Sequence, residues 1–265
     1  MSDATRAPRH PMTLRPVVLE LPGMHEVTVR TDVDADGPTL DLYAPPGGSG
    51  QRPAVVFVSG YPDPGFERML GCKLKDMASY VSWARLVAAS GMIAVTYANR
   101  EPADVALVMR HLRAHGATLG IDPDRIAVWA SSGNVPNALS LLLRGAEVRV
   151  ACAVLAYGYT LDLDGATHVA DAAKQHYFAT PAAGQSIEDF RADAPLFLVR
   201  AGRDEMAGLN DSLDRFAAAA LARNLPITLT NLPTAPHAFD IVEDKEDSRE
   251  IIRQMLGFFR FHLAG

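Results

Sequence analysis

Three residue types that together can perform nucleophilic catalysis occur in order along this chain: Ser132, Asp204 and His237. Each lies shortly after an apolar run. A serine hydroxyl is a weak nucleophile until a base removes its proton, and a histidine base needs a third group that fixes its tautomer and orientation. Together the three residues would let the serine attack a carbonyl carbon and form a covalent acyl-enzyme.

The serine lies in a segment that changes character abruptly. Residues 126–136 read IAVWASSGNVP, in which an apolar, strand-like run stops at two serines and a glycine. The following residues 137–144 are rich in alanine and leucine and indicate a helix. A serine on a tight strand-to-helix turn exposes its Oγ, and the N–H of the next residue, Gly133, is free at the helix N-terminus. A serine there is also favoured simply as a helix N-cap, so the order with Asp204 and His237 carries the catalytic interpretation.

Ser131 competes with Ser132 for the role of nucleophile. Choosing Ser131 places Gly133 two residues later, as in the G-x-S-x-G motif, but it places Trp129 two residues earlier. The strand end and the helix start approach closely at that point, so an indole should not fit. Choosing Ser132 places an alanine before it and Asn134 after it, where glycine is usual. We favour Ser132, with Asn134 as the larger departure from the motif.

The elements that must position these residues follow from hydrophobic patterning. Apolar runs of four to six residues alternate with helical patterns, which predicts an α/β fold. The runs are almost continuously apolar, as expected for a mostly parallel central sheet with helices on both faces. In such a sheet, functional groups lie past the carboxyl ends of the strands. The predicted strands are 54–58, 92–97, 126–129, 150–155, 196–199 and 227–229, and the predicted helices lie near 79–89, 103–115, 135–144, 209–223 and 247–262.

The ends and one internal segment depart from this alternation. Runs 27–30 and 40–43 flank a turn-rich stretch and predict an N-terminal antiparallel hairpin at the sheet edge. Residues 1–22 are predicted to form a loose tail and residues 23–265 a single domain. Residues 157–193, called here the cap segment, lack clear strands. A segment of that length predicts a short helical cap insertion over the strand ends.

Composition limits the partners. The 265 residues are 48% hydrophobic and 21% charged, with a net charge of −6. An acidic chain argues against nucleic acid or an anionic membrane as a partner. Two cysteines are too few for a disulfide framework, and no apolar run resembles a signal peptide or a membrane span. These features predict a cytoplasmic protein. They leave the oligomeric state open, with a homodimer as one alternative.

The segment IDPDRIAVWASSGNVPNAL resembles the elbow region of α/β-hydrolase fold serine esterases of the dienelactone-hydrolase and carboxylesterase branch. VRAGRDEM, which contains Asp204, and APHAF, which contains His237, are similar to the acid and histidine loops of that family. The resemblance implies an α/β-hydrolase fold. It also implies cleavage of a small or medium-sized carboxylic ester through an acyl-enzyme on Ser132, without a cofactor. Glu205 stays open as an alternative acid.

Two further groups of residues complete the expected site. The oxyanion hole of such an enzyme needs two donors, for which we expect the backbone N–H groups of Gly133 and Tyr61. Tyr61 lies in a Gly- and Pro-rich loop that begins with Ser59 and Gly, where many relatives have His and Gly. Tyr157 and Tyr159 follow the strand after the elbow helix and are the candidates for lining a substrate pocket.

Other functions fit parts of the pattern. The same three residues could serve an amide or thioester hydrolase or an acyltransferase, because specificity depends on the pocket. The departures at Asn134 and Ser59 would also suit a non-catalytic binding protein with the same fold. His168, Asp171 and His176 could suggest a metal, but their spacing matches no standard site. We therefore expect a polar cap helix there and no metal.

Overall fold

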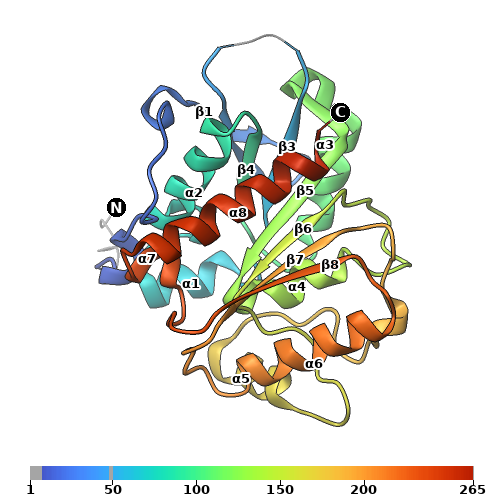
Figure 1. Ribbon diagram of the computed structural model, residues 1–265. Coiled ribbons are helices and arrows are strands. Elements are labelled where there is room, and N and C mark those ends of the chain that lie inside the picture. The colour runs from blue at the N-terminus through green and yellow to red at the C-terminus, as the bar shows by residue number, and fades with distance from the viewer. Residues whose placement is uncertain (1–7, 48–49, 265) are drawn as a thin grey trace, which may run out of the picture.

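Eight strands form one sheet in a computed structural model that describes residues 8–47 and 50–264 (Figure 1). The strand order is β1-β2-β4-β3-β5-β6-β7-β8. The pairs β1–β2 and β2–β4 are antiparallel, and every other pair is parallel. The predicted α/β sheet and its N-terminal hairpin are confirmed. The strands are β1 (Thr28–Asp34), β2 (Thr39–Ala44), β3 (Arg52–Phe57), β4 (Ile93–Tyr97), β5 (Ile121–Ser131), β6 (Ala153–Ala156), β7 (Leu196–Ala201) and β8 (Ile227–Leu232).

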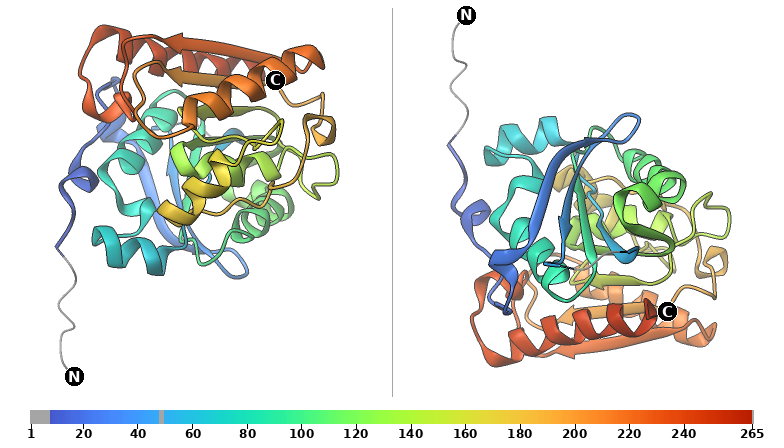
Figure 2. Two further views of the ribbon diagram at one scale, coloured as in Figure 1. Left: turned by 90° about the horizontal axis from the view of Figure 1, so that it is seen from below. Right: turned by 90° about the horizontal axis from the view of Figure 1, so that it is seen from above.

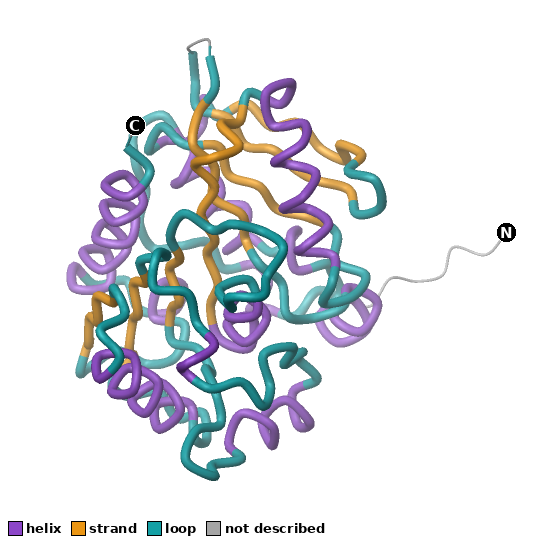
Figure 3. Tube along the Cα trace, turned by 90° about the vertical axis from the view of Figure 1, so that its right-hand side faces the viewer, coloured by secondary structure: helices purple, strands orange, loops and turns teal. Residues whose placement is uncertain are grey.

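Helices cover both faces of the sheet, as predicted (Figure 2). Alternate residues of a strand point to opposite faces. In β5, Ala127 and Trp129 pack with residues of α2 and α8, whereas Ile126 and Val128 pack with residues of α3, α4 and α6. The tube in Figure 3 shows the strands running between these helices. The helices are α1 (Asp63–Leu70), α2 (Ala78–Ala89), α3 (Asp104–Leu119), α4 (Val135–Ser140), α5 (His168–His176), α6 (Leu209–Ala222), α7 (Phe239–Val242) and α8 (Glu246–His262).

Helix α4 is shorter than predicted. It ends at Ser140, whereas the sequence pattern continues to residue 144. The backbone beyond it pairs with the end of the cap segment instead. The Arg144 N–H donates to the Asp189 carbonyl at 2.8 Å, and the Arg191 N–H donates to the Leu142 carbonyl at 3.0 Å. These contacts satisfy backbone groups that a longer helix would have used internally.

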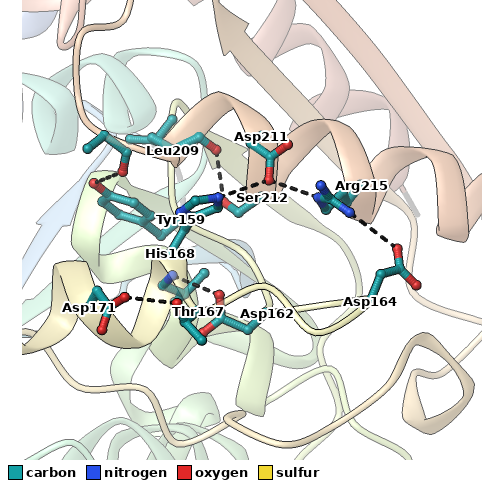
Figure 4. A network of polar contacts seen from close by, with 12 residues as sticks. Tyr159, Asp162, Asp164, Thr167, His168, Asp171, Leu209, Asp211, Ser212 and Arg215 are labelled. Carbon is teal, nitrogen blue, oxygen red and sulfur yellow. Dashed lines mark hydrogen bonds and ion pairs between the residues drawn. The ribbon is translucent and has the colours of Figure 1, made fainter.

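The cap segment contains α5 and otherwise mostly loops. Helix α5 lies beside the start of α6 (Figure 4). Asp162 satisfies free N–H groups at the start of α5, because its carboxylate accepts hydrogen bonds from the Val169 and Ala170 N–H groups. His168 lies against Gly208, where an added Cβ would be 2.4 Å from the histidine Cβ. The cap segment is therefore closely packed against the start of α6.

The N-terminal segment differs from the loose tail that was predicted. Residues 1–7 lie outside the described residues, but the part after them packs on the domain. Val17 and Leu19 are buried, and the Val17 N–H donates to Ser82 Oγ at 2.8 Å. The Val18 N–H donates to the Asp240 carbonyl at 2.8 Å. A short apolar stretch thus attaches this segment to α2 and α7. None of the described helices is long and apolar enough to cross a membrane.

Candidate active site

The chain turns sharply at Ser132, between β5 and α4. Its φ is 54°, whereas Ser131 before it has an extended backbone. A short 3₁₀ turn over Ser132–Asn134 follows, and α4 then begins at Val135 with a proline in its first turn. Positive φ is uncommon for residues other than glycine and clusters at functional sites. This geometry is that of the nucleophile elbow.

The structure brings Ser132, His237 and Asp204 together in one hydrogen-bonded chain. Ser132 Oγ lies 2.9 Å from His237 Nε2, and His237 Nδ1 lies 2.6 Å from Asp204 Oδ2. The Asp204 side chain is fully buried, whereas 27% of the His237 side chain is exposed. The other Asp204 oxygen, Oδ1, accepts a hydrogen bond from the Met206 N–H at 3.0 Å. A buried carboxylate in this position can fix the imidazole tautomer with its proton on Nδ1.

The two competing residues lie nearby but make other contacts. Ser131 is buried beside the phenols of Tyr80 and Tyr157. Burial raises the pKa of both phenols well above the usual value, and hydrogen bonding to Ser131 partly offsets the rise. Glu205 is exposed and lines a separate polar depression beside His237. Neither residue is part of the hydrogen-bonded chain.

Asn134 is the larger departure from the elbow motif, and both polar atoms of its side-chain amide are hydrogen-bonded. It is 4% exposed. Its Oδ1 accepts a hydrogen bond from the Gly60 N–H at 2.7 Å. Its Nδ2 donates to Tyr80 Oη at 2.9 Å and to the Ser131 carbonyl at 3.0 Å. The amide therefore connects the elbow to the β3–α1 loop (residues 58–62), a link that glycine could not form.

The β3–α1 loop lies very close to the elbow. A Cβ added at Gly60 would be 2.5 Å from the Gly133 carbonyl oxygen and 3.0 Å from the Asn134 Cα. Such contacts are too short for any side chain, so glycine is required at this approach. The Gly60 carbonyl also accepts a hydrogen bond from the Ala179 N–H of the cap segment at 2.8 Å. The loop is thus held between the elbow and the cap segment.

A cavity of about 230 Å³ opens beside Ser132 and His237. Tyr157, one of the two candidate pocket residues, is among those that line it. Tyr159 instead stacks on Phe178, with ring centroids 5.4 Å apart, and donates to the Ala207 carbonyl at 3.1 Å. Most of the remaining lining is aromatic or aliphatic and includes Tyr61, Phe66, Met77, Trp83, Trp129 and Ile241.

Asp240 is a lining residue that the sequence analysis missed. Its carboxylate accepts hydrogen bonds from Tyr157 Oη at 2.6 Å and from Trp83 Nε1 at 2.7 Å. Burial raises the pKa of Asp240, and the two hydrogen bonds oppose that rise. An aspartate three residues after His237 carries no local signal, because its importance comes from Tyr157, just after β6, and Trp83 of α2, which lie far away in sequence.

Asp63, at the start of α1, should make stability depend on pH. Burial raises its pKa from 3.8 to about 6, against a hydrogen bond from the Asn99 N–H. The native state therefore binds this proton more tightly than the unfolded chain does. The contribution of Asp63 to the free energy of unfolding is present below pH 3.8 and is lost as the pH rises to about 6. The asparagine of Asp63→Asn does not titrate, so this loss of stability with rising pH should be absent in the variant.

Urea unfolding of both proteins between pH 4 and 7 measures the effect. We expect the free energy of unfolding of Asp63→Asn, relative to wild type, to increase over this range. A relative value that stays constant with pH would contradict the raised pKa. Because the comparison subtracts wild type from the variant at each pH, all other titrating groups cancel to first order.

The described residues contain one group of three potential metal ligands: Asp36, His111 and His115. It lies on the β1–β2 turn and α3, and none of its members lines the cavity beside Ser132. Of the residues considered in the cap segment, His168 and Asp171 have other contacts. His168 Nε2 lies 3.5 Å from Asp211, and Asp171 accepts a hydrogen bond from Thr167 Oγ1 at 2.9 Å.

Solved structures resemble most of the chain, although it matches no protein-family model and no curated protein. MGS-M1, an α/β-hydrolase enzyme from a Medee basin deep-sea metagenome library, is 16% identical, with a TM-score of 0.63 over 90% of this chain and 98% of that chain. A bacterial heroin esterase is 18% identical, with a TM-score of 0.69 over 94% and 88%. The esterase Est2 from Thermogutta terrifontis, with propionate bound, is 18% identical, with a TM-score of 0.65 over 92% and 96%.

These similarities extend over nearly the whole length of each protein compared. They show that this chain has the α/β-hydrolase fold. They do not separate the dienelactone-hydrolase branch from other branches, so that assignment stays a prediction.

Proposed function

We propose that this protein is a serine hydrolase that cleaves a small or medium-sized carboxylic ester through an acyl-enzyme on Ser132. The observation that carries the proposal is the hydrogen-bonded chain from Ser132 Oγ through His237 to the buried Asp204, with distances of 2.9 and 2.6 Å. The esterases among the structures with the same fold add support for ester cleavage.

In the first half of the reaction, His237 Nε2 accepts the proton of Ser132 Oγ while Oγ bonds to the ester carbonyl carbon. The carbonyl π pair moves to the oxygen, and Asp204 stabilises the imidazolium through Nδ1–H. When the tetrahedral intermediate collapses, the bond to the alcohol oxygen breaks and His237 gives its proton to the leaving alcohol. Water then attacks the acyl-enzyme by the same steps, with His237 again as base. The proton transfers use only these three side chains, and the oxyanion needs hydrogen-bond donors in addition.

The cavity beside Ser132 favours a short, uncharged acyl group. Its volume of about 230 Å³ lies below the roughly 300–1,000 Å³ usual for drug-sized ligands. Its described lining is mainly apolar, contains the Asp240 carboxyl and has no lysine or arginine. A carboxylate on the acyl group would therefore be desolvated there without a cation to pair with.

Hydrolysis of p-nitrophenyl esters with acyl chains of increasing length tests this function. We expect turnover of acetate and butyrate esters, a decline for long acyl chains, and stoichiometric labelling by a fluorophosphonate on the peptide that contains Ser132. An anilide and a thioester of the same acyl group, assayed alongside, separate ester from amide or thioester specificity. A folded protein with neither turnover nor labelling would reject the hydrolase and support a binding protein.

A further inference from the structure

The β3–α1 loop uses both of its candidate backbone donors within the protein. The Gly60 N–H donates to Asn134 Oδ1 at 2.7 Å. The Tyr61 N–H donates to Ser59 Oγ at 3.3 Å, and that hydroxyl donates to the Tyr61 carbonyl at 3.0 Å. An oxyanion hole requires two donors directed at the developing charge. Gly133 supplies one N–H directly after the nucleophile, so the second donor has to be sought elsewhere.

The Tyr61 hydroxyl lies against the residue that provides the first donor. A Cβ added at Gly133 would be 2.2 Å from Tyr61 Oη and 2.9 Å from its Cζ. The phenol therefore occupies the space where any side chain at position 133 would lie, in contact with the backbone that carries the Gly133 N–H. Tyr61 also lines the cavity that contains Ser132. A carbonyl oxygen next to the Gly133 N–H would be close to this hydroxyl.

The hydroxyl is also available to donate. Every hydrogen bond that Tyr61 makes to another described residue involves its backbone, and its Oη has no partner in that part of the chain. Burial raises its pKa to about 12, so the phenol keeps its proton at neutral pH. Tyr61 is half-buried and lines the cavity, so its hydroxyl can donate to a ligand there without first breaking a hydrogen bond to another described residue.

Contacts from three elements fix the position of the ring. It packs on Phe66 of α1, with ring centroids 5.5 Å apart, and meets Phe178 of the cap segment edge-on at 6.1 Å. Asn99, which follows β4, donates from Nδ2 to the Tyr61 carbonyl at 2.8 Å. Transition-state stabilisation depends on donors that are already in place before charge develops, and this packing provides that condition.

We propose that the Tyr61 hydroxyl is the second oxyanion donor, acting with the Gly133 N–H. The inference rests on the proposed function and replaces the expectation that Tyr61 contributes its backbone N–H. As Ser132 Oγ bonds to the carbonyl carbon, the π pair moves to the carbonyl oxygen and the phenol O–H donates a hydrogen bond to it. No proton is transferred from Tyr61. The hydrogen bond weakens again when the pair reforms the carbonyl and the alcohol leaves.

Tyr61→Phe tests whether the donor is the hydroxyl or the backbone N–H, because the variant keeps the N–H and the ring and lacks only the hydroxyl. We expect kcat to fall by about 10²–10³-fold, as for loss of one oxyanion donor, with little change in KM. The inhibition constant of a trifluoromethyl ketone, which forms an oxyanion on the serine, should rise by a similar factor. A merely structural role for the hydroxyl would not produce this parallel change.

Tyr177→Phe is the matched control, since Tyr177 is 72% exposed and lies near the same loop. It should leave kcat and the inhibition constant unchanged. If Tyr61→Phe retains wild-type kcat in a protein of unchanged unfolding temperature, the proposal is overturned and the backbone N–H is the donor. If wild type itself shows no turnover and no fluorophosphonate labelling, the proposed function fails instead, so the two failures are distinguishable.

Discussion

Ser132→Ala is expected to lower kcat for short p-nitrophenyl esters by about 10⁴-fold or more, since the nucleophile of a triad cannot be replaced by its neighbours. Ser132 Oγ lies 2.9 Å from His237 Nε2, and no other described hydroxyl is bonded to that nitrogen. Without this oxygen no acyl-enzyme can form. The activity that stays should reflect only binding and the oxyanion hole. Fluorophosphonate labelling should be lost as well.

Ser131→Ala is the matched control, one residue earlier in the chain. Its hydroxyl lies beside the phenols of Tyr80 and Tyr157, and although Ser131 lines the same cavity it is not hydrogen-bonded to His237. We expect kcat within about tenfold of wild type, because a hydroxyl that does not touch the reacting atoms contributes only packing and hydrogen bonding. The unfolding temperature of both variants checks that each is folded. Loss of labelling in Ser131→Ala, with labelling retained in Ser132→Ala, would move the nucleophile by one residue.

The preference for Ser132 over Ser131 could be argued from the sequence because it depends on local geometry. Trp129 and Ser131 are two residues apart on β5, so their side chains lie on the same face of the sheet. Trp129 is 2% exposed and packs against Trp83, with ring centroids 5.2 Å apart. The backbone then leaves the strand at Ser132, where φ becomes positive. The residue two positions before Ser132 is Ala130, which is buried and small, so the preference for Ser132 stays a prediction that fits this turn.

Features that depend on distant partners could not be predicted in this way. The sequence makes Asn134 look like a defect in the elbow, because its partner Gly60 lies on another loop. The end of α4 is set by backbone pairing with residues near 190. Val17 and Leu19 form too short an apolar run to predict docking, and their neighbour Val18 bonds to Asp240 near the other end of the chain. Local patterning predicts elements and their order, whereas these contacts arise only when the elements meet.

Asp204→Asn is expected to lower kcat by about 10⁴-fold, through the tautomer of His237 rather than through loss of structure. Asp204 Oδ1 accepts the Met206 N–H at 3.0 Å, so an asparagine would keep its carbonyl oxygen there. Its NH₂ group would then face His237 Nδ1, which the carboxylate oxygen approaches at 2.6 Å. The imidazole would have to accept that hydrogen bond and carry its proton on Nε2. In this tautomer it cannot take the proton of Ser132.

Glu205→Gln, the neighbouring change, should leave kcat within about twofold, because Glu205 is exposed and the hydrogen bond to His237 Nδ1 comes from Asp204. A large loss in Glu205→Gln with an active Asp204→Asn would transfer the acid role to Glu205. A double variant sharpens the test. Residues that act as a unit are strongly non-additive, so Ser132→Ala combined with Asp204→Asn should be no slower than Ser132→Ala alone. Multiplied losses in the double variant would mean that Asp204 acts independently of Ser132.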